Sequence, residues 1–90
     1  MQVDPESLTV VHNLEENRFE IRVGSYLAEL KYRLRGETIT FMHTGVPSAL
    51  EGQGVGSMLV KSGLEYAREN GLKVEARCPF VAAYLQRHPE

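Results

Sequence analysis

Residues 18 to 46 contain three consecutive segments with the character of β-strands, and only two or three residues separate one segment from the next. Segments 18–23 and 26–34 alternate apolar and polar side chains, and segment 38–46 is rich in β-branched and aromatic residues. Alternation with a period of two is typical of strands that are buried on one face. Short connections join antiparallel neighbours, because a parallel connection has to cross the sheet. The stretch therefore predicts an antiparallel meander, with a further short strand at 8–14 before it.

The alternation also predicts which side chains point into the core. In the third segment, strict alternation places His43 on the same face as Ile39 and Phe41. The inward set of the two earlier segments is expected to be Phe19, Ile21, Val23, Tyr26, Ala28, Leu30, Tyr32 and Leu34. These residues predict one apolar face against which a helix can pack.

The pattern changes after residue 46, where a glycine-rich stretch leads into an amphipathic helix. Apolar residues recur at helical spacing from Val55 to Ala67, and Asn70-Gly71 is a typical helix stop. Segment 72–78 alternates again, with its even-numbered residues facing inward, and the proline after it suits the start of a second helix. A strand–helix–strand unit places its two strands in parallel with a right-handed crossover. The expected fold class is mixed α+β: an antiparallel meander, a parallel strand–helix–strand unit and a short C-terminal helix.

Length and composition limit the classes of function. A chain of 90 residues is expected to form one domain, 1–90. Its 10 Lys and Arg against 12 Asp and Glu give a formal charge of −2, without the basic stripe that predicts nucleic-acid binding. No segment has the length and character of a membrane span or a secretion signal, and no Cys–His spacing predicts a metal site. One unpaired cysteine fits a soluble protein of a reducing compartment, the cytoplasm.

The glycine-rich stretch is the first candidate for chemistry. Gly52, Gly54 and Gly56 alternate at the start of the predicted helix. A helix N-terminus presents unpaired N–H groups and a partial positive charge, and glycines let a phosphate approach that backbone closely. The spacing is neither a Rossmann fingerprint nor a P-loop, because no Gly-Lys-Ser/Thr follows. A tight loop that simply requires glycine explains the same residues.

The stretch Gly52-Gln53-Gly54-Val55-Gly56-Ser57-Met58-Leu59-Val60 resembles the acetyl-CoA signature of the GNAT family of N-acetyltransferases. His43-Thr44 before it, and Cys78-Pro79-Phe80-Val81 and His88-Pro89-Glu90 after it, are similar to a small single-domain subgroup of that family. The resemblance extends from about residue 8 to residue 90. It implies a GNAT-like fold, acetyl-CoA or coenzyme A as cosubstrate, and no metal.

The resemblance also implies roles for individual residues. The backbone of the stretch Glu51, Gly52, Gln53, Gly54, Val55, Gly56 and Ser57 would hold the cofactor pyrophosphate. The strand that contains Thr44, Gly45 and Val46 would pair with the pantetheine arm and direct the thioester toward Cys78. Two residues depart from the family pattern. Glu51 stands where arginine or glutamine is usual, so its carboxylate is expected to point away from phosphate, and Gly45 stands where an acidic residue is expected.

Two side chains are candidates for catalysis. Cys78 directly precedes the predicted helix start at Pro79, and a helix N-terminus favours a thiolate, which could accept the acetyl group or line the thioester pocket. Packing as a small buried apolar residue is the alternative. His43 could remove a proton from an attacking ammonium near neutral pH, or it could be a structural histidine.

The predicted function is transfer of an acetyl group from acetyl-CoA to a primary amine. A protein lysine or amino terminus is one acceptor class, because so small a chain has little surface with which to enclose a metabolite. Direct transfer with His43 or water as base, and a Cys78 acetyl-thioester, are the two routes. A CoA-binding sensor or protein-interaction module without catalysis and a generic nucleotide binder are the alternatives. Neither the acceptor nor the oligomeric state can be deduced from the sequence.

Overall fold

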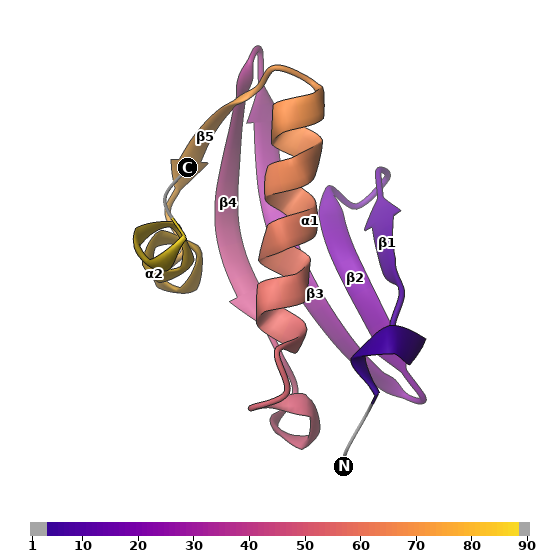
Figure 1. The fold of residues 1–90 in the computed structure, drawn as a ribbon. Coiled ribbons are helices and arrows are strands. Elements are labelled where there is room, and N and C mark those ends of the chain that lie inside the picture. Colours follow the sequence, from indigo (N-terminus) through magenta and orange to yellow (C-terminus); the bar gives the residue numbers. More distant parts are fainter. Residues whose placement is uncertain (1–3, 89–90) are drawn as a thin grey trace.

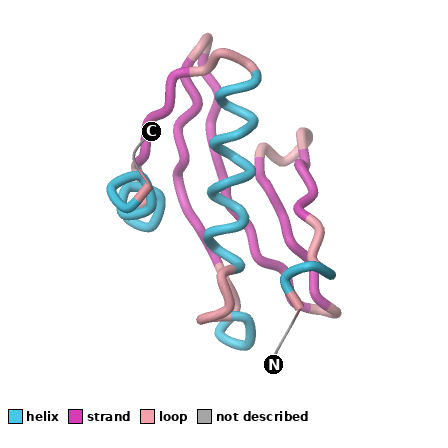
Figure 2. The backbone as a smooth tube through the Cα atoms, viewed as in Figure 1, coloured by secondary structure: helices cyan, strands magenta, loops and turns pink. Residues whose placement is uncertain are grey.

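The computed structural model describes residues 4–88, and this part of the chain contains one five-stranded sheet and two α-helices (Figure 1). In chain order the elements are η1 (Pro5–Ser7), β1 (Val10–Asn13), β2 (Arg18–Val23), β3 (Tyr26–Arg35), β4 (Thr38–Gly45), η2 (Ser48–Leu50), α1 (Val55–Glu69), β5 (Lys73–Ala76) and α2 (Pro79–Arg87). The long helix α1 lies across one face of the sheet, and α2 lies beside the lower end of β4 (Figure 2). The predicted mixed α+β class is confirmed.

The strands follow one another across the sheet in the order β1-β2-β3-β4-β5. Each neighbouring pair from β1 to β4 is antiparallel, and β4 and β5 are parallel. The meander and the parallel strand–helix–strand unit are therefore as predicted. The two edge strands are shorter than the segments 8–14 and 72–78 that the pattern indicated.

Helix α1 covers the apolar face of the sheet and completes the core. The largest fully buried side chains come from both layers: Ile21, Leu30, Ile39, Phe41, Leu50, Val55, Leu59, Val60 and Val81. Gly63 marks a very close approach between the layers, because a Cβ there would lie 2.8 Å from Cε1 of Phe41. Each large side chain buried in this way contributes roughly 1.5 to 3 kcal/mol relative to exposure.

Three side chains predicted to face the core are exposed: Tyr26 (38%), Leu34 (43%) and Val74 (40%). Tyr26 and Leu34 lie at the two ends of β3. A strand of 10 residues is about 33 Å long, whereas a helix of 15 residues is about 22 Å long, so α1 cannot cover both ends. Val74 lies on the edge strand β5, where it lines a groove between α1 and α2. Alternation predicted the face of the sheet on which these residues lie, but not how far the helices cover that face.

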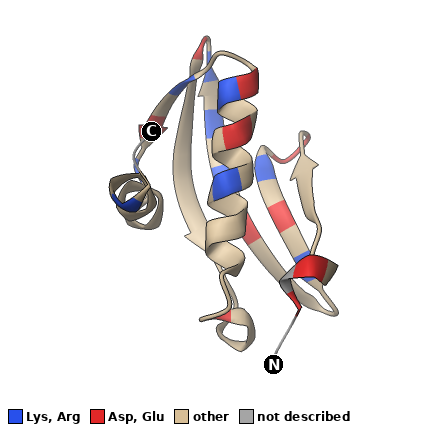
Figure 3. Cartoon of the chain, viewed as in Figure 1, with Lys and Arg blue, Asp and Glu red and all other residues tan. Residues whose placement is uncertain are grey.

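The sheet face opposite α1, which we call the open face, carries the polar half of the alternation. Its members on β2 and β3 include Arg18, Arg22, Glu29, Lys31 and Arg33, which are exposed or half-buried. Figure 3 shows blue and red residues along these strands and none on the N-terminal end of α1, residues 55–60.

One irregularity in β4 reverses the predicted alternation. Phe41 is opposite Tyr32 and His43 is opposite Lys31, so the register shifts between the two pairs and Met42 is an extra residue. An extra residue in one strand is a β-bulge, which moves all later side chains to the other face. Thr44, opposite the buried Leu30, therefore faces α1, and His43 lies on the open face. The prediction that His43 shares a face with Ile39 and Phe41 was wrong for this reason.

Candidate functional site

The loop between β4 and α1 ends in an uncapped helix N-terminus. Gly52 and Gly54 have φ angles of 77° and 79°, in the left-handed region that costs other residues roughly 1 to 2 kcal/mol. Gly54 is the N-cap residue, no side chain caps the helix, and no acidic residue lies in its first turn. The first N–H groups of a helix have no intrahelical partner and attract anions together with the helix dipole. The N-cap residue and the first turn therefore supply no side chain that neutralises this end of α1.

A pocket of about 510 Å³ opens over this helix end. It is lined by Thr44, Val46, Leu50, Glu51, Gly52, Gly54, Val55, Gly56, Ser57, Phe80 and Arg87. All of the residues predicted to contact the cofactor line it except Gly45 and Gln53. The Gln53 amide instead donates a 3.4 Å hydrogen bond to the carbonyl of Ala49 within the loop. The structure therefore gathers most of the predicted binding residues around one concavity.

Two lining residues from α2 were not predicted. A Cβ at Gly56 would lie 2.8 Å from Cζ of Phe80, so this glycine lets the ring pack against the first turn of α1. Phe80 belongs to the Cys-Pro-Phe-Val motif, and this motif was the one sequence feature that could have indicated its place in the pocket. Arg87, a basic residue, lines the same pocket as the acidic Glu51. Its position depends on how α2 packs, for which the sequence contains no local pattern.

Strands β4 and β5 separate beside this pocket. Their last pair is Phe41 with Ala76, and the N–H groups of Arg77 and Cys78 both donate to the carbonyl of Phe41, at 3.0 and 3.1 Å. Beyond this point β4 continues to Gly45, whereas the chain after β5 turns into α2 (Figure 1). The edge of β4 that faces β5 is thus without a strand partner at residues 42–45 in the described part of the chain.

Cys78 lies at this separation, as the N-cap residue of α2. Its side chain is 5% exposed, and its Sγ is 3.4 Å from Oγ1 of Thr44. Burial raises the pKa of the thiol, but hydrogen bonds from the Thr44 hydroxyl and from the N–H groups of Val81, Phe80 and Thr44 outweigh it, so the pKa lies below its ordinary value. The predicted inward position of Cys78 is confirmed. Its surroundings favour a thiolate, which is the reactive form of cysteine.

His43 and Cys78 do not form a pair. Cys78 contacts Thr44 on the side of α1, whereas His43 is exposed on the open face and has no hydrogen bond to a described residue. The residue directly opposite His43 is Lys31 of β3, and Glu29 of the same strand lies opposite Gly45. A Cβ at Gly45 would lie 3.3 Å from Nε2 of His43 and 3.8 Å from Oε2 of Glu29. Nothing in the sequence marks Glu29 as a candidate site residue, because it is one of several polar residues in an alternating strand.

A second groove, of about 490 Å³, lies between α1, β5 and α2. Tyr84 lines this groove and stacks on His88, with ring centroids 4.3 Å apart. Within residues 4–88 there is no group of three His, Cys, Asp or Glu side chains that could hold a metal ion. None of the helices described is long and apolar enough to cross a membrane.

Comparison with known proteins gives the family. The family model of GCN5-related N-acetyl-transferases matches residues 18–90. The chain belongs to this family. Protein NATD1 of Xenopus tropicalis is 30% identical over 91 residues, which cover 97% of this chain and 84% of the relative. Human NATD1 is 29% identical over 85 residues, covering 91% and 75%.

A solved structure confirms the GNAT fold. The solution NMR structure of a GCN5-like protein from Staphylococcus aureus superimposes with a TM-score of 0.71 at 41% sequence identity. The match covers 89% of this chain and 79% of that chain. The uncapped helix, the pocket and the separated strands described above thus belong to a GNAT domain with the sheet and helix order predicted from the sequence.

Proposed function

We propose that this protein transfers an acetyl group from acetyl-CoA to a primary amine. The observation that carries the proposal is the uncapped N-terminus of α1, which opens into a pocket beside the unpaired edge of β4. Family membership supports it, because GNAT domains generally use acetyl-CoA. A protein lysine or amino terminus is the acceptor class that suits so small a domain.

The residues of the pocket fit a nucleotide diphosphate. The N–H groups of Val55, Gly56 and Ser57 occupy the first three helical positions, where they have no intrahelical acceptor. Arg87 adds a positive charge to the same lining. The carboxylate of Glu51 belongs to an exposed residue and can remain in solvent while a phosphate contacts the helix end. Apolar contacts from Val46 and Phe80 would cover the rest of the cofactor.

The gap between β4 and β5 fits the acyl-transfer step. The N–H of Thr44 points toward Cys78 and thus into the gap, where it can donate to a carbonyl oxygen that becomes an oxyanion. The amine nitrogen attacks the thioester carbon, a C–N bond forms, and the C–S bond then breaks with CoA leaving as a thiolate. In the direct route His43 or water accepts the proton of the ammonium. In the covalent route the Cys78 thiolate carries the acetyl group first.

A binding experiment followed by a product assay tests the proposal. We expect acetyl-CoA to bind in isothermal titration calorimetry and ATP to compete much more weakly. A panel of lysine peptides and polyamines is then assayed for acetylated products by mass spectrometry. Binding and turnover of at least one amine support the proposal, and equal competition by ATP indicates a generic nucleotide site instead.

A non-catalytic CoA-binding module is the second candidate function. It is favoured by Gly45, which supplies no carboxylate where the family pattern places one, and by the separation of His43 from Cys78. Tight acetyl-CoA binding without turnover of any amine would support this module. If turnover is found, rapid-quench mass spectrometry for an acetyl group on Cys78 distinguishes the routes. Full activity of Cys78→Ala would eliminate the covalent one.

A further inference from the structure

Gly45 leaves a narrow space on the open face beside the gap, in which even a Cβ would be crowded. Its φ is not in the left-handed region, so the backbone does not require glycine there. Glycine weakens a strand and often marks a place where a ligand approaches closely. The atoms nearest to the missing Cβ are Nε2 of His43 at 3.3 Å and Cγ and Oε2 of Glu29 at 3.7 and 3.8 Å. An imidazole and a carboxylate therefore border this space.

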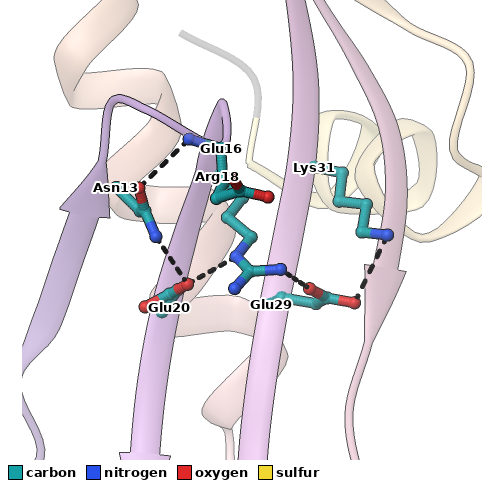
Figure 4. A network of polar contacts seen from close by, with 6 residues as sticks. All are labelled: Asn13, Glu16, Arg18, Glu20, Glu29 and Lys31. Carbon is teal, nitrogen blue, oxygen red and sulfur yellow. Dashed lines mark hydrogen bonds and ion pairs between the residues drawn. The ribbon is translucent and has the colours of Figure 1, made fainter.

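Glu29 is held in place by a network of charges on the open face (Figure 4). Arg18 donates from a terminal nitrogen to Oε1 of Glu29 at 3.1 Å, and its Nε donates to Glu20. Asn13 donates to the same Glu20 carboxylate at 3.1 Å. These contacts fix the guanidinium between two carboxylates that are directly opposite in the register. Glu29 is thus oriented by the sheet rather than by a mobile loop.

The oxygen of Glu29 that borders Gly45 retains capacity to accept a hydrogen bond. Its nearest cation is the Lys31 ammonium at 3.8 Å, which is beyond hydrogen-bond distance. The side chain is 21% exposed, so a ligand in solvent can reach it. The nitrogen of His43 across the space has no partner among the described residues.

The two groups are close enough to contact one nitrogen atom. Because Nε2 of His43 and Oε2 of Glu29 lie 3.3 and 3.8 Å from a common point, they are at most 7.1 Å apart. Two hydrogen bonds of about 2.9 Å through a single nitrogen span up to about 5.8 Å. A small rotation of the exposed imidazole is enough to close the difference. The space is also one residue from Thr44, whose N–H faces the gap.

We propose that Glu29 and His43 form the binding site for the acceptor amine, an inference that rests on the proposed acyl transfer. Glu29 binds the ammonium, and Nε2 of His43 accepts one of its protons and releases it to solvent. The neutral amine attacks the thioester, and its second proton leaves with the CoA thiolate. Glu29, from β3, thereby supplies the carboxylate that the family pattern places at position 45 of β4, and Gly45 provides the room.

Variants of three open-face residues test this assignment kinetically. With the best amine of the peptide and polyamine panel, Glu29→Gln is expected to raise the acceptor KM at least tenfold and to leave the affinity for acetyl-CoA unchanged. Glu75→Gln is the matched control, because it also removes an open-face carboxylate that an arginine contacts, Arg77, but neither borders Gly45 nor holds Glu29. Gly45→Ala should also raise the acceptor KM, because its Cβ would lie 3.3 Å from Nε2 of His43 and would fill the space. An unchanged KM in Glu29→Gln, or an equal rise in the control, would overturn the assignment.

A binding readout separates this assignment from the proposed function. Propylammonium chloride is titrated into the CoA-loaded protein, and the His43 ring signals are followed by NMR. We expect a saturable shift in the wild type and in Glu75→Gln, and its loss in Glu29→Gln, with folding of each variant verified by thermal melting. The absence of a saturable shift in the wild type refutes the amine site. A saturable shift without turnover of any acceptor would instead refute the proposed function and support the site.

Discussion

The two glycines inside α1 should respond in opposite ways to the same substitution. Alanine is favoured over glycine in a helix interior by about 1 kcal/mol, so Gly63→Ala gains this amount if nothing resists the methyl group, and Gly56→Ala, in the first turn of α1, gains less. At Gly63 the methyl would lie 2.8 Å from Phe41 and 3.2 Å from Leu30, and both side chains are fully buried. At Gly56 the obstacle is Phe80, which is 37% exposed.

The magnitudes depend on how freely each obstacle can move. Overpacking of a closed core costs about 1 to 3 kcal/mol, and the upper half of that range applies at Gly63, where ring and helix are both fixed. Subtracting the helical gain leaves a net loss of about 1 to 2 kcal/mol, which corresponds to a fall in Tm of roughly 5 to 15 °C for a domain of this size. At Gly56 the exposed ring can rotate outward, so we expect stability close to that of the wild type.

For acetyl-CoA binding we expect the opposite order, with Gly56→Ala as the impaired variant and Gly63→Ala as the unimpaired one. Phe80 lines the pocket over the helix end, so its displacement in Gly56→Ala should weaken acetyl-CoA binding, whereas Gly63 does not line the pocket. Differential scanning calorimetry measures the two Tm values, and isothermal titration below both transitions measures affinity. A Gly63→Ala protein as stable as the wild type would refute the packing argument, and unimpaired binding by Gly56→Ala would refute the role assigned to the Phe80 contact.

Four further outcomes are expected. Gly54→Ala should lower stability by roughly 1 to 2 kcal/mol in chemical denaturation, because its φ of 79° is left-handed, and should also weaken acetyl-CoA binding. Alkylation of Cys78 by iodoacetamide should reach half its maximal rate below pH 9.0, and Thr44→Val should raise that midpoint, since the Thr44 hydroxyl helps to lower the thiol pKa. Burial raises the pKa of Glu20, but hydrogen bonds from Asn13 and Arg18 outweigh it and place it below the usual 4.5. The stability that Glu20 contributes is therefore complete at neutral pH and lost as pH falls from about 4.5 through the lower folded value, and a circular-dichroism acid titration of Glu20→Gln should lack this component. Arg87→Gln should weaken CoA binding about two- to fivefold, as expected for an exposed charge contact, and the difference should shrink at high salt.

The order of elements was predictable because each one has its own local signal. The alternation at 18–34 and the helical period after Val55 determine strand and helix, and the short turns leave little choice of topology. The glycine turn was also identifiable, since Gly52 and Gly54 adopt the left-handed backbone for which glycine is suited. Features that depend on local pattern alone were therefore predicted, and in the correct order along the chain.

The side-chain arrangement at the site depends on a feature with no local signal. The extra residue in β4, Met42, reverses the faces of His43 and Thr44 relative to strict alternation. Neither Met42 nor its neighbours Phe41 and His43 are typical turn residues, so the sequence does not show where the alternation is interrupted. The same applies to Arg87 and Glu29, whose positions near the pocket and near Gly45 arise only from the packing of α2 and the register of β3.

The β-bulge at Met42 determines which side chains lie near Cys78 and which lie near Gly45. It turns Thr44 toward Cys78 and turns His43 toward Glu29, so the groups that lower the pKa of the thiol and the groups that border Gly45 lie on opposite sides of one strand. The thiolate is favoured by N–H and hydroxyl donors and needs no imidazole. His43 therefore need not activate Cys78, and it is free to take a proton from an amine that approaches from the open face. In the proposed reaction, the acyl group would lie in the gap and the amine above Gly45, on the two sides of β4. The residue inserted in β4, rather than any single side chain, would therefore determine whether both reactants can be bound.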